Sequence, residues 1–457
     1  MPKQKFDYDL IVIGAGAGGS VAATIANNAG KRVAMIEAGR MGGECPNWGC
    51  IPTKAMIYAA NIYADAKHAS EFGLRTAMIG YNYPSIKAWK DKVVRRTGAA
   101  QGKQYYESLG IDVIKGEAHF LSPYEVTVNR RHYTAANFII ASGSKTTIPP
   151  IDGLADVPYI TNREALELNR PPKSTFIVGG GAIGCEFAQL FATFGSKVHI
   201  AEIAPRILPN EDEETSKLLT EIFTKQNGMS IHTNAKVLSV EKEGVAKRVT
   251  YRIGDDTRSV RVDELMIATG KEAIVDFGLE NAGISYSRQG ITVNEHLQTN
   301  VSHIYAAGDV IGHFMFTHMS IYQGRLAAHN VLHPRKMLSA DYRAVPHVIF
   351  LQPEVAAVGM LEDECLKRAM EYKKATAPIS IISRANVNDI NNGFVKVITN
   401  QHGILIGATV VAPHAGEIIH ELTLAVQLGV SASEVASTIH AFPTWSEAVR
   451  VACAKIK

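Results

Sequence analysis

The sequence is poor in three features that mark other classes of protein: cysteine, long apolar runs and clusters of one charge. Its 457 residues include 5 cysteines, a small and odd number that does not support a disulfide-stapled secreted scaffold. No uninterrupted apolar run approaches the roughly 18 residues that a membrane-spanning helix needs, so we expect no membrane span. The 47 basic and 44 acidic residues give a net charge of +3 without a dense Lys/Arg run, which argues against a nucleic-acid partner.

The beginning of the chain has an apolar run that glycines cut short. Leu10–Ile13 is followed by Gly14, Gly16 and Gly18, and no cleavage site follows, so we interpret the run as a buried strand and not as a signal peptide. Together with the few cysteines, this predicts a cytoplasmic protein. In a reducing compartment, a closely spaced cysteine pair points to a chemical role.

A pattern of strand, glycine-rich loop, alanine-rich helix and strand occurs twice. The elements expected in the first copy are a strand at Tyr8–Ile13, a helix at Ser20–Ala29 and a strand at Arg32–Glu37. The elements expected in the second copy are a strand at Ser174–Val178, a helix at Cys185–Phe194 and a strand at Lys197–Glu202. Both copies have the order of an α/β unit that binds a dinucleotide.

Each loop carries the spacing G-x-G-x-x-G, with Gly14, Gly16 and Gly19 in the first loop and Gly179, Gly181 and Gly184 in the second. The first glycine permits a tight turn, the second lets the backbone approach a pyrophosphate, and the third lets the helix pack on the strand. Glu37 and Glu202 each follow the last glycine by 18 positions and can accept a hydrogen bond from a ribose hydroxyl. One such loop can be a mere turn, but the repetition favours two bound dinucleotides.

Two dinucleotides in one chain favour a flavin with a nicotinamide, because a flavin accepts a hydride and passes the electrons on. A carboxylate at Glu202 would repel the 2′-phosphate of NADPH, so NADH is favoured as the donor. Arg206 lies nearby and softens this preference.

The pattern of apolar residues changes after about Asp341. Phe394–Thr399 and Ile404–Val411 are β-rich runs around a turn and predict a hairpin. Helical periodicity follows over Ala415–Leu428. We therefore expect a third domain of mixed α+β type.

Cys45 and Cys50 form the closely spaced cysteine pair. Residues five apart in a regular helix lie too far apart for a disulfide, but Pro46 and Gly49 indicate a distorted turn that could bring the two sulfurs together. The alternatives are an inert buried pair or half of a zinc site, although the sequence has no second cysteine pair for tetrahedral zinc.

The residues after the pair predict a helix. Pro52 suits a helix start and Thr53–Lys67 is a good helix former, so Cys50 would lie at a helix N-terminus, where a thiolate is stabilised. Lys54 places a positive charge on the same face. Glu44 and Trp48 are unusual in this motif: Glu44 would raise the pKa of Cys45 or attract a cationic substrate, and both readings stay open.

Taken together, these motifs resemble the flavoprotein disulfide reductases, a group that includes dihydrolipoamide dehydrogenase, glutathione reductase and mercuric reductase. The resemblance spans nearly the whole chain. It rests on the two glycine loops, Gly43-x-Cys45-x4-Cys50-x-Pro52-x-Lys54, Ala141-Ser142-Gly143, Ala268-Thr269-Gly270 and Ala307-Gly308-Asp309.

The resemblance implies an α/β fold with two Rossmann-like dinucleotide-binding domains, for FAD and NAD(P), and a C-terminal α+β dimerisation domain. The expected boundaries are 1–150 and 272–340 for the two parts of the FAD-binding domain, 151–271 for the NAD(P)-binding domain and 341–457 for the dimerisation domain. Two copies of the chain would form a homodimer, in which the third domain lends residues to the partner's active site.

By resemblance, FAD binds the first glycine loop, Glu37, Ala118, Ser142, Gly143 and Asp309, with Asp309 on the ribityl chain. Met315, Phe316 and Thr317 would line the flavin ring. The resemblance also places Gly43, Glu44, Lys54 and, with the second glycine loop, Gly270 among the cofactor-binding residues.

The resemblance further implies the catalytic roles. Cys50 would form the charge-transfer thiolate against the flavin, and Cys45 the interchange thiol that meets the substrate. Lys54 would lie near the flavin N5 and pair with Glu186.

The chain departs from the thiol-oxidising members of the group at its C-terminal segment, which runs from His440 to Glu447. Those members have a histidine before the Pro-Thr pair and a glutamate that orients it. Here Glu447 is present, but the base position is Phe442, which cannot take a proton. His440 lies two residues away, on the same face if the segment is extended, and is the candidate substitute. The mercuric reductase branch usually has a tyrosine at this position and a paired-cysteine tail, and neither occurs here.

These observations predict an enzyme: an FAD-dependent NAD(P)H oxidoreductase in which a Cys45–Cys50 disulfide passes electrons to a small acceptor. Without a base at position 442, the acceptor is expected to need no proton abstraction, as with a metal ion such as Hg(II) or Cu(II), a quinone or an activated disulfide. Dihydrolipoamide dehydrogenase is the alternative. A flavin-binding redox sensor with vestigial turnover is the alternative of another class.

Other candidate residues have simpler interpretations. His414, Glu417 and His420 recur at helical spacing, but their surroundings favour an interface helix over a metal site, and no metal is expected. The cysteines outside the pair, which are Cys185, Cys365 and Cys453, are predicted to be packing residues.

Overall fold

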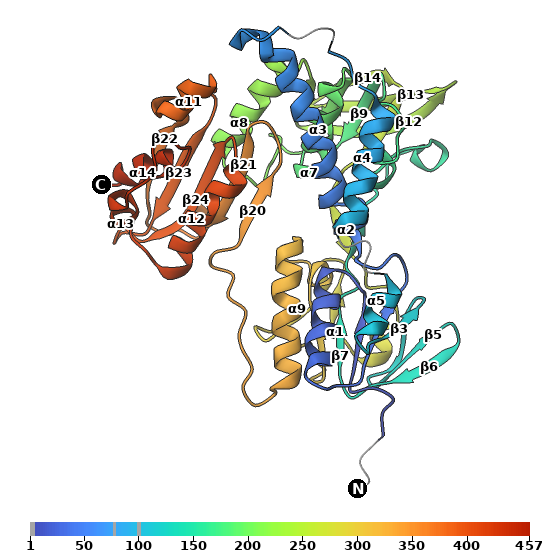
Figure 1. The fold of residues 1–457 in the computed structure, drawn as a ribbon. Coiled ribbons are helices and arrows are strands. Elements are labelled where there is room, and N and C mark those ends of the chain that lie inside the picture. Colours follow the sequence, from blue (N-terminus) through green and yellow to red (C-terminus); the bar gives the residue numbers. More distant parts are fainter. Residues whose placement is uncertain (1–4, 76–78, 98–101) are drawn as a thin grey trace. The chain divides into compact units, whose positions relative to one another are not determined.

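The computed structural model describes residues 5–75, 79–97 and 102–457, which form two compact units. The first unit draws its described residues from Met1–Met56, Asn82–Thr147 and Gly270–Ala340. The second unit draws them from Ile57–Tyr81, Ile148–Thr269 and Asp341–Lys457. Each unit is therefore assembled from segments far apart in the sequence, as the colours in Figure 1 show.

The first unit is centred on a five-stranded parallel sheet. Its strand order is β19 (Ile304–Ala306), β7 (Phe138–Ile140), β1 (Leu10–Ile13), β2 (Val33–Glu37) and β3 (Asp112–Lys115). Strand β1 is entirely buried, with Ile11 and Ile13 in one apolar core and Leu10 and Val12 in another, because successive side chains of a strand point to opposite faces. Such a continuous apolar run is typical of a parallel sheet covered on both faces.

Helices α1 (Ala17–Asn28) and α9 (Thr317–Leu332) lie side by side in this unit (Figure 1). They approach so closely that a Cβ on Gly324 would lie 2.3 Å from the carbonyl oxygen of Gly18. Both helices contribute alanines to the core that contains Leu10 and Val12, so they cover the same face of the sheet.

The first unit also contains shorter elements. Its other helices include α2 (Glu44–Trp48), α3 (Cys50–His68), which continues into the second unit, α4 (Tyr83–Arg96) and α5 (Lys103–Ser108). Antiparallel strands are β4 (His119–Ser122), β5 (Glu125–Val128) and β6 (Arg131–Thr134), and the pair β8 (Ser144–Thr146) and β16 (Lys271–Ala273).

The second unit contains, in its described residues, another parallel sheet and two antiparallel sheets. The parallel sheet has the order β11 (Ser230–His232), β10 (Lys197–Ala201), β9 (Ser174–Val178) and β15 (Glu264–Ile267). A three-stranded antiparallel sheet is formed by β12 (Ala235–Glu243), β13 (Ala246–Ile253) and β14 (Asp256–Val262). The helices of this part include α6 (Asn162–Ala165), α7 (Ala182–Thr193) and α8 (Glu213–Glu221).

The last part of the chain forms a five-stranded antiparallel sheet with helices. The strand order is β20 (Pro346–Ile349), β21 (Glu354–Gly359), β24 (Leu405–Ala412), β23 (Phe394–Thr399) and β22 (Lys373–Pro378). Its helices include α10 (Glu362–Lys367), α11 (Ser383–Asn388), α12 (Ala415–Leu428), α13 (Ala432–Ser437) and α14 (Glu447–Ala454). One apolar core joins the sheet to α12, α13 and α14.

The predicted elements agree with the structure in kind and differ at some ends. Strands β9 and β23 and helix α12 have the predicted bounds, and β23 and β24 form the predicted hairpin. Helices α1 and α7 begin three residues earlier than predicted, because the middle glycine of each loop is already the N-cap. Residues 44–48, expected to be irregular, form α2, since Pro46 lies in the first turn, where a helix needs no N–H donor. Helix α3 begins at Cys50 and not at Thr53.

No helix in the described part of the chain is both long enough and apolar enough to cross a bilayer.

Candidate active site

Cys45, in α2, and Cys50, the first residue of α3, lie close together on the two sides of Gly49. This residue separates α2 from α3, and a Cβ on it would lie 3.1 Å from the Cα of Cys45 and 3.2 Å from the carbonyl oxygen of Glu44. Glycine therefore permits the close approach. The two thiols are hydrogen-bonded to each other, and the Sγ of Cys50 lies 3.6 Å from the Oγ1 of Thr317. This proximity is what a disulfide between the two residues requires.

The pKa of Cys45 is raised well above its ordinary value, first by the hydrogen bond with Cys50 and then by burial. The hydroxyl of Thr317 acts in the opposite direction. Both interpretations of Glu44, an effect on the pKa of Cys45 and the attraction of a cationic substrate, stay predictions.

Side chains around the pair brace its loop. The Nδ2 of Asn47 donates hydrogen bonds to the carbonyl oxygens of Met41 and Gly43, at 3.0 and 2.8 Å. The guanidinium of Arg40 lies 5.1 Å from the ring centre of Trp48, a cation–π contact. Trp48, unusual at its position in the sequence, therefore has a structural partner. Neither Arg40 nor Asn47 belongs to a recognisable motif, so their contacts near the cysteine pair could not be predicted from the sequence.

The first glycine loop has the geometry of a dinucleotide site. Gly14 has a φ of +102°, and a Cβ on it would lie 2.2 Å from the carbonyl oxygen of Ala141, so only glycine fits. A Cβ on Gly19 would lie 1.9 Å from the carbonyl oxygen of Gly14. Gly16 is the N-cap of α1 without a side-chain cap, which leaves the first N–H groups of the helix for a ligand such as a pyrophosphate.

The carboxylate of Glu37 closes this loop. Its Oε2 accepts a hydrogen bond from the N–H of Ala15 at 2.7 Å, and its Oε1 accepts one from the N–H of Gly39 at 2.6 Å. Gly43, with a φ of +70°, faces the same loop, since a Cβ on it would lie 2.8 Å from the Cα of Gly16. The segment that carries Glu44 and the cysteines therefore packs directly on the glycine loop.

Several other residues predicted for FAD follow the strands of the same sheet. Gly143, with a φ of +77°, comes after β7, and Asp309 comes after β19. The Oδ2 of Asp309 accepts a hydrogen bond from the Oγ of Ser144 at 2.6 Å and lies 4.0 Å from the Nζ of Lys271. The Oγ of Ser142 donates to the carbonyl oxygen of Ile274 at 2.9 Å.

The remaining residues predicted for FAD lie before β4 and at the start of α9. Ala118 is buried, Met315 and Phe316 are partly buried, and Thr317 is the first residue of α9. Fully buried Gln323 of the same helix accepts a hydrogen bond from the N–H of Gly308 at 2.8 Å and so anchors the turn before Asp309. Ser144 and Gln323 were missed because neither stands in a recognisable motif.

The residues present fit a flavin dinucleotide. The glycine loop offers an uncapped helix N-terminus and close backbone approach for a pyrophosphate, and Glu37 offers a fixed carboxylate for a ribose. Thr317 touches Cys50 at the start of α9, which puts the cysteine pair beside the residues predicted to line the flavin ring.

The second glycine loop repeats the first. Cβ atoms on Gly179 and Gly184 would lie 2.3 Å from the carbonyl oxygen of Ala268 and 2.0 Å from that of Gly179. Gly181 is the uncapped N-cap of α7, and a Cβ on it would meet nothing within 4 Å, which leaves space for a ligand.

Glu202 presents its carboxylate to this loop. Its Oε2 accepts a hydrogen bond from the N–H of Gly180 at 2.6 Å, and its Oε1 accepts one from the N–H of Ala204 at 2.8 Å. Gly270, predicted for the same site, has a φ of +101°, which favours glycine.

Glu186, the predicted partner of Lys54, is buried in α7, with 5% of its surface exposed. Its Oε1 accepts a hydrogen bond from the N–H of Phe350 at 3.0 Å. Lys54 belongs to the first unit and Glu186 to the second, so their pairing stays a prediction.

The arrangement of His440 does not favour it as a substitute base. Its side chain is 5% exposed, its Nε2 lies 2.9 Å from the Oε1 of Glu421, and its Nδ1 lies 2.8 Å from the carbonyl oxygen of Thr438. Both partners accept hydrogen bonds, so neither ring nitrogen faces outward to receive a proton from a substrate.

Phe442, at the base position, is 71% exposed. Glu447 has a buried Oε2 that finds no hydrogen-bond partner among the described residues. The carboxylate that the resemblance assigns to orienting a base is thus retained without a base to orient.

This part of the chain also exposes large apolar side chains. Leu424 and Leu428 on α12 are 60% and 68% exposed, and Ile439 and Phe442 are 97% and 71% exposed. Exposed apolar surface of this kind is typical of an interface with another chain.

The other cysteines are buried, and His414 lies directly before α12. Burial raises the pKa of the thiols of Cys185, Cys365 and Cys453, in the last case to about 12, so they stay protonated. Within residues 5–75, 79–97 and 102–457, no three His, Cys, Asp or Glu side chains are grouped so as to hold a metal ion, and His414 instead forms the N-cap of α12.

Comparisons with known proteins agree with this geometry. The family model for pyridine nucleotide-disulphide oxidoreductases matches residues 8–324, and the model for the dimerisation domain of the same family matches residues 345–453. The chain is 33% identical over 449 residues to a mercuric reductase of Staphylococcus aureus, covering 98% of this chain and 82% of that protein. It is 35% identical over 453 residues to a dihydrolipoyl dehydrogenase of Bacillus subtilis, covering 96% and 94% of the two.

A solved structure with a similar fold is the Cu(II) complex of the HOCl-induced flavoprotein disulfide reductase RclA from Escherichia coli. The TM-score is 0.87 with 29% sequence identity, and the match covers 98% of this chain and 99% of that one. The family binds FAD and takes electrons from NAD(P)H, and its dimerisation domain indicates a homodimer. With two Rossmann-like regions, a C-terminal dimerisation domain and a cysteine pair in α2 and at the start of α3, this chain belongs to the pyridine nucleotide-disulphide oxidoreductase family.

Proposed function

We propose that this protein is a homodimeric reductase that passes electrons from NADH, by way of FAD and the Cys45–Cys50 pair, to a thiol-binding metal ion such as Cu(II) or Hg(II). The observation that carries the proposal is Phe442, an exposed side chain without proton affinity at the base position. A metal ion needs thiolate ligands and electrons but no general base. Quinones and activated disulfides share that property and belong in the same assays.

Bound FAD would supply the two-electron relay between the nicotinamide and the disulfide. The chain's own residues would orient the two dinucleotides. Gly16 and Gly181 leave the N-termini of α1 and α7 for the pyrophosphates, and Glu37 and Glu202 present carboxylates to the riboses.

The cysteine pair would deliver the electrons. Oxidation of the dithiol of Cys45 and Cys50 to a disulfide releases two electrons and two protons, which suffice to reduce one Hg(II) to Hg(0) or two Cu(II) to two Cu(I). Cys45 would be the thiol that meets the acceptor. Its raised pKa keeps the proton in place until the metal ion displaces it, because metal binding to a thiol releases the proton.

Glu44, directly before Cys45, would favour a cationic acceptor. Its carboxylate lies in the first turn of α2, directly before the thiol proposed to meet the acceptor, where a negative charge would attract a cation. The name of the mercuric reductase relative and the Cu(II) complex of RclA support a metal ion as the acceptor.

Dihydrolipoamide dehydrogenase stays the second candidate, because a relative at 35% identity carries the name dihydrolipoyl dehydrogenase and because Glu447 is retained. Anaerobic titration with NADH tests the shared part of both candidates. A long-wavelength thiolate–flavin band is expected in the wild type and in C453A, which removes a buried cysteine elsewhere, and is expected to disappear in C50S. Absence of the band in the wild type would overturn the disulfide relay.

Steady-state assays with Cu(II), Hg(II), a quinone and oxidised small thiols as acceptors of electrons from NADH, and with dihydrolipoamide as a donor to NAD⁺, then separate the candidates. Rapid dihydrolipoamide oxidation that H440A abolishes would favour the second candidate. Turnover with none of these compounds would favour a redox sensor.

A further inference from the structure

The loop after Glu202 is tied to the second glycine loop at both of its ends. The carboxylate of Glu202 accepts hydrogen bonds from Gly180 and Ala204, and the N–H of Leu208 donates to the carbonyl oxygen of Gly180 at 2.7 Å. A Cβ on Gly180 would lie 3.0 Å from the Cγ2 of Ile207. Arg206 is thus held at a fixed place beside the carboxylate that would bind the ribose.

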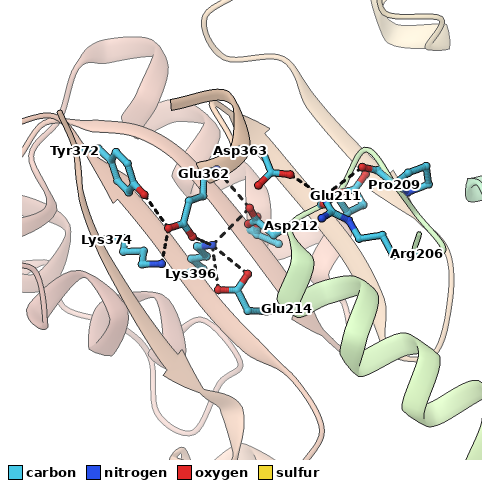
Figure 2. Close-up of polar contacts among 11 residues, drawn as sticks. Arg206, Pro209, Glu211, Asp212, Glu214, Glu362, Asp363, Tyr372, Lys374 and Lys396 are labelled. Carbon is cyan, nitrogen blue, oxygen red and sulfur yellow. Dashed lines mark hydrogen bonds and ion pairs between the residues drawn. The ribbon is translucent and has the colours of Figure 1, made fainter. Parts of the chain in front are cut away.

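The guanidinium of Arg206 is turned toward the C-terminal part of the second unit. One terminal nitrogen donates to the carbonyl oxygens of Pro209 and Glu211, at 3.4 and 3.1 Å, and to the Oδ2 of Asp363 at 2.7 Å (Figure 2). The Nε is buried and has no hydrogen-bond partner within the described residues. The side chain is therefore held mainly through one nitrogen, and Asp363 supplies its only carboxylate partner in the described part of the chain.

A buried ion network fixes the helix that carries Asp363. Lys396 on β23 is 1% exposed, and its Nζ lies 3.5 Å from Asp212, 3.2 Å from Glu214 and 2.5 Å from Glu362. Asp212 also accepts hydrogen bonds from the hydroxyl of Thr409 and from the N–H of Glu362, at 2.8 and 3.3 Å. Figure 2 shows these side chains converging between the start of α8 and the start of α10, next to Arg206 and Asp363.

We propose that Asp363 is a specificity-determining residue for the nicotinamide nucleotide: it holds Arg206 away from the ribose and so preserves the discrimination against a 2′-phosphate. This inference rests on the proposed binding of NADH at the second glycine loop. A 2′-phosphate is a dianion that Arg206 would pair with strongly if its guanidinium were free, because arginine forms charge-assisted, often bidentate hydrogen bonds with phosphate. The C-terminal part of the chain, through Asp363, thereby controls a residue of the nucleotide site.

The test measures dissociation constants of NAD⁺ and NADP⁺ by calorimetry on the FAD-loaded protein, and it compares wild type, D363A, R206A and the double variant. D363A is expected to lower the ratio of the NADP⁺ constant to the NAD⁺ constant about tenfold, the value of one charge-assisted hydrogen bond. The double variant is expected to return to the wild-type ratio. Asp363 has a side chain 43% exposed, so its replacement leaves the core intact.

E364A is the matched control, because Glu364 lies on the same helix and pairs with Arg368, the residue directly after that helix. It is expected to leave the ratio within about twofold of the wild-type value. D363N, which keeps the shape and removes the charge, is expected to shift the ratio in the same direction as D363A.

An unchanged ratio in D363A, or a lowered ratio that persists when Arg206 is also removed, would overturn the role of Asp363. Weak binding of both nucleotides by the wild type would instead count against the proposed function.

Discussion

At the scale of single residues, the C-terminal segment lacks a base at Phe442 but has Glu447, the carboxylate that would orient one. Phe442 offers a ring where a proton acceptor would be needed, and His440 has both ring nitrogens against internal acceptors. Glu447 keeps a buried oxygen that no described residue satisfies, and such an oxygen costs stability unless something compensates it. The segment therefore retains the means to orient a base.

Replacing Phe442 by histidine is expected to create dihydrolipoamide oxidation activity. The new imidazole would find the unpaired oxygen of Glu447, and a positioned base contributes about 10²–10⁴-fold to a rate, so we expect a gain in kcat/KM of at least about tenfold. NAD⁺ reduction by dihydrolipoamide is the assay. F442Q, which removes the ring without adding a base, should show no gain, and equal activity of both variants would contradict the account.

His347 on β20 is expected to make stability depend on pH. Its Nε2 lies 2.8 Å from the Oε1 of Glu211. Burial opposes protonation of His347, but the hydrogen bond and the charge of Glu211 outweigh burial, so the pKa of His347 is raised. A raised pKa in the folded state gives a contribution to stability that is complete below the unfolded value of about 6.5 and is lost as pH rises through the folded value.

The free energy of unfolding, measured by denaturant titration over a series of pH values, checks this expectation. The difference between the wild type and H347Q should be largest below about pH 6.5 and should shrink at higher pH. A difference that grows with pH would show that folding lowers the pKa of His347 instead of raising it.

At the scale of helices and strands, most of the elements were predicted from the apolar runs and the glycine loops. Strand β9 and helix α12 have the predicted bounds because their hydrophobic patterns end where the elements end. The predicted starts of α1, α3 and α7 lie three residues after the observed ones. The N-caps of α1 and α7 are Gly16 and Gly181, and glycine as a residue type does not indicate that a helix begins there. Helix α2 was missed because a proline is compatible with a first turn as well as with an irregular segment.

The contact between α1 and α9 is expected to tolerate no side chain at Gly324. A Cβ there would lie 2.3 Å from the carbonyl oxygen of Gly18, and overpacking of this kind costs about 1–3 kcal/mol. Thermal unfolding of G324A should therefore show a lower Tm than the wild type. In G80A the new Cβ meets nothing within 4 Å, so this control should keep the wild-type Tm. Equal Tm values for G324A and the wild type would mean that the helices separate without cost.

At the scale of the whole molecule, the sequence predicted the family and the kinds of domain but not the contacts that join distant segments. Strand β19 completes the first parallel sheet with residues 304–306, far along the chain from the other strands of that sheet. The buried network around Lys396 brings together residues more than a hundred positions apart, Asp212 and Lys396 among them, and no periodicity or spacing indicates such a pairing. The boundaries at 150, 271 and 340 stay predictions.

The exposed apolar side chains of α12 predict how the dimer forms. Leu424 and Leu428 are one helical turn apart and share a face, so L424D/L428D is expected to shift the protein from a dimer to the chain mass of 49.5 kDa. Light scattering of the FAD-loaded protein measures the mass. V245D alters a side chain that is 93% exposed on another part of the second unit and should leave the dimer intact. A dimer that survives L424D/L428D would place the interface elsewhere.

The central claim is that the reduced Cys45–Cys50 pair gives its electrons to a thiol-binding metal ion, Cu(II) or Hg(II), without the help of a base. The most direct measurement mixes the NADH-reduced enzyme anaerobically with Cu(II) or with Hg(II) and follows NADH consumption together with the reduced metal. We predict one NADH consumed per Hg(II) or per two Cu(II), with loss of turnover in C45S and C50S but not in C453A. Full turnover with the metal ions in C45S, or dihydrolipoamide oxidation by the wild type faster than any metal reduction, would contradict the claim.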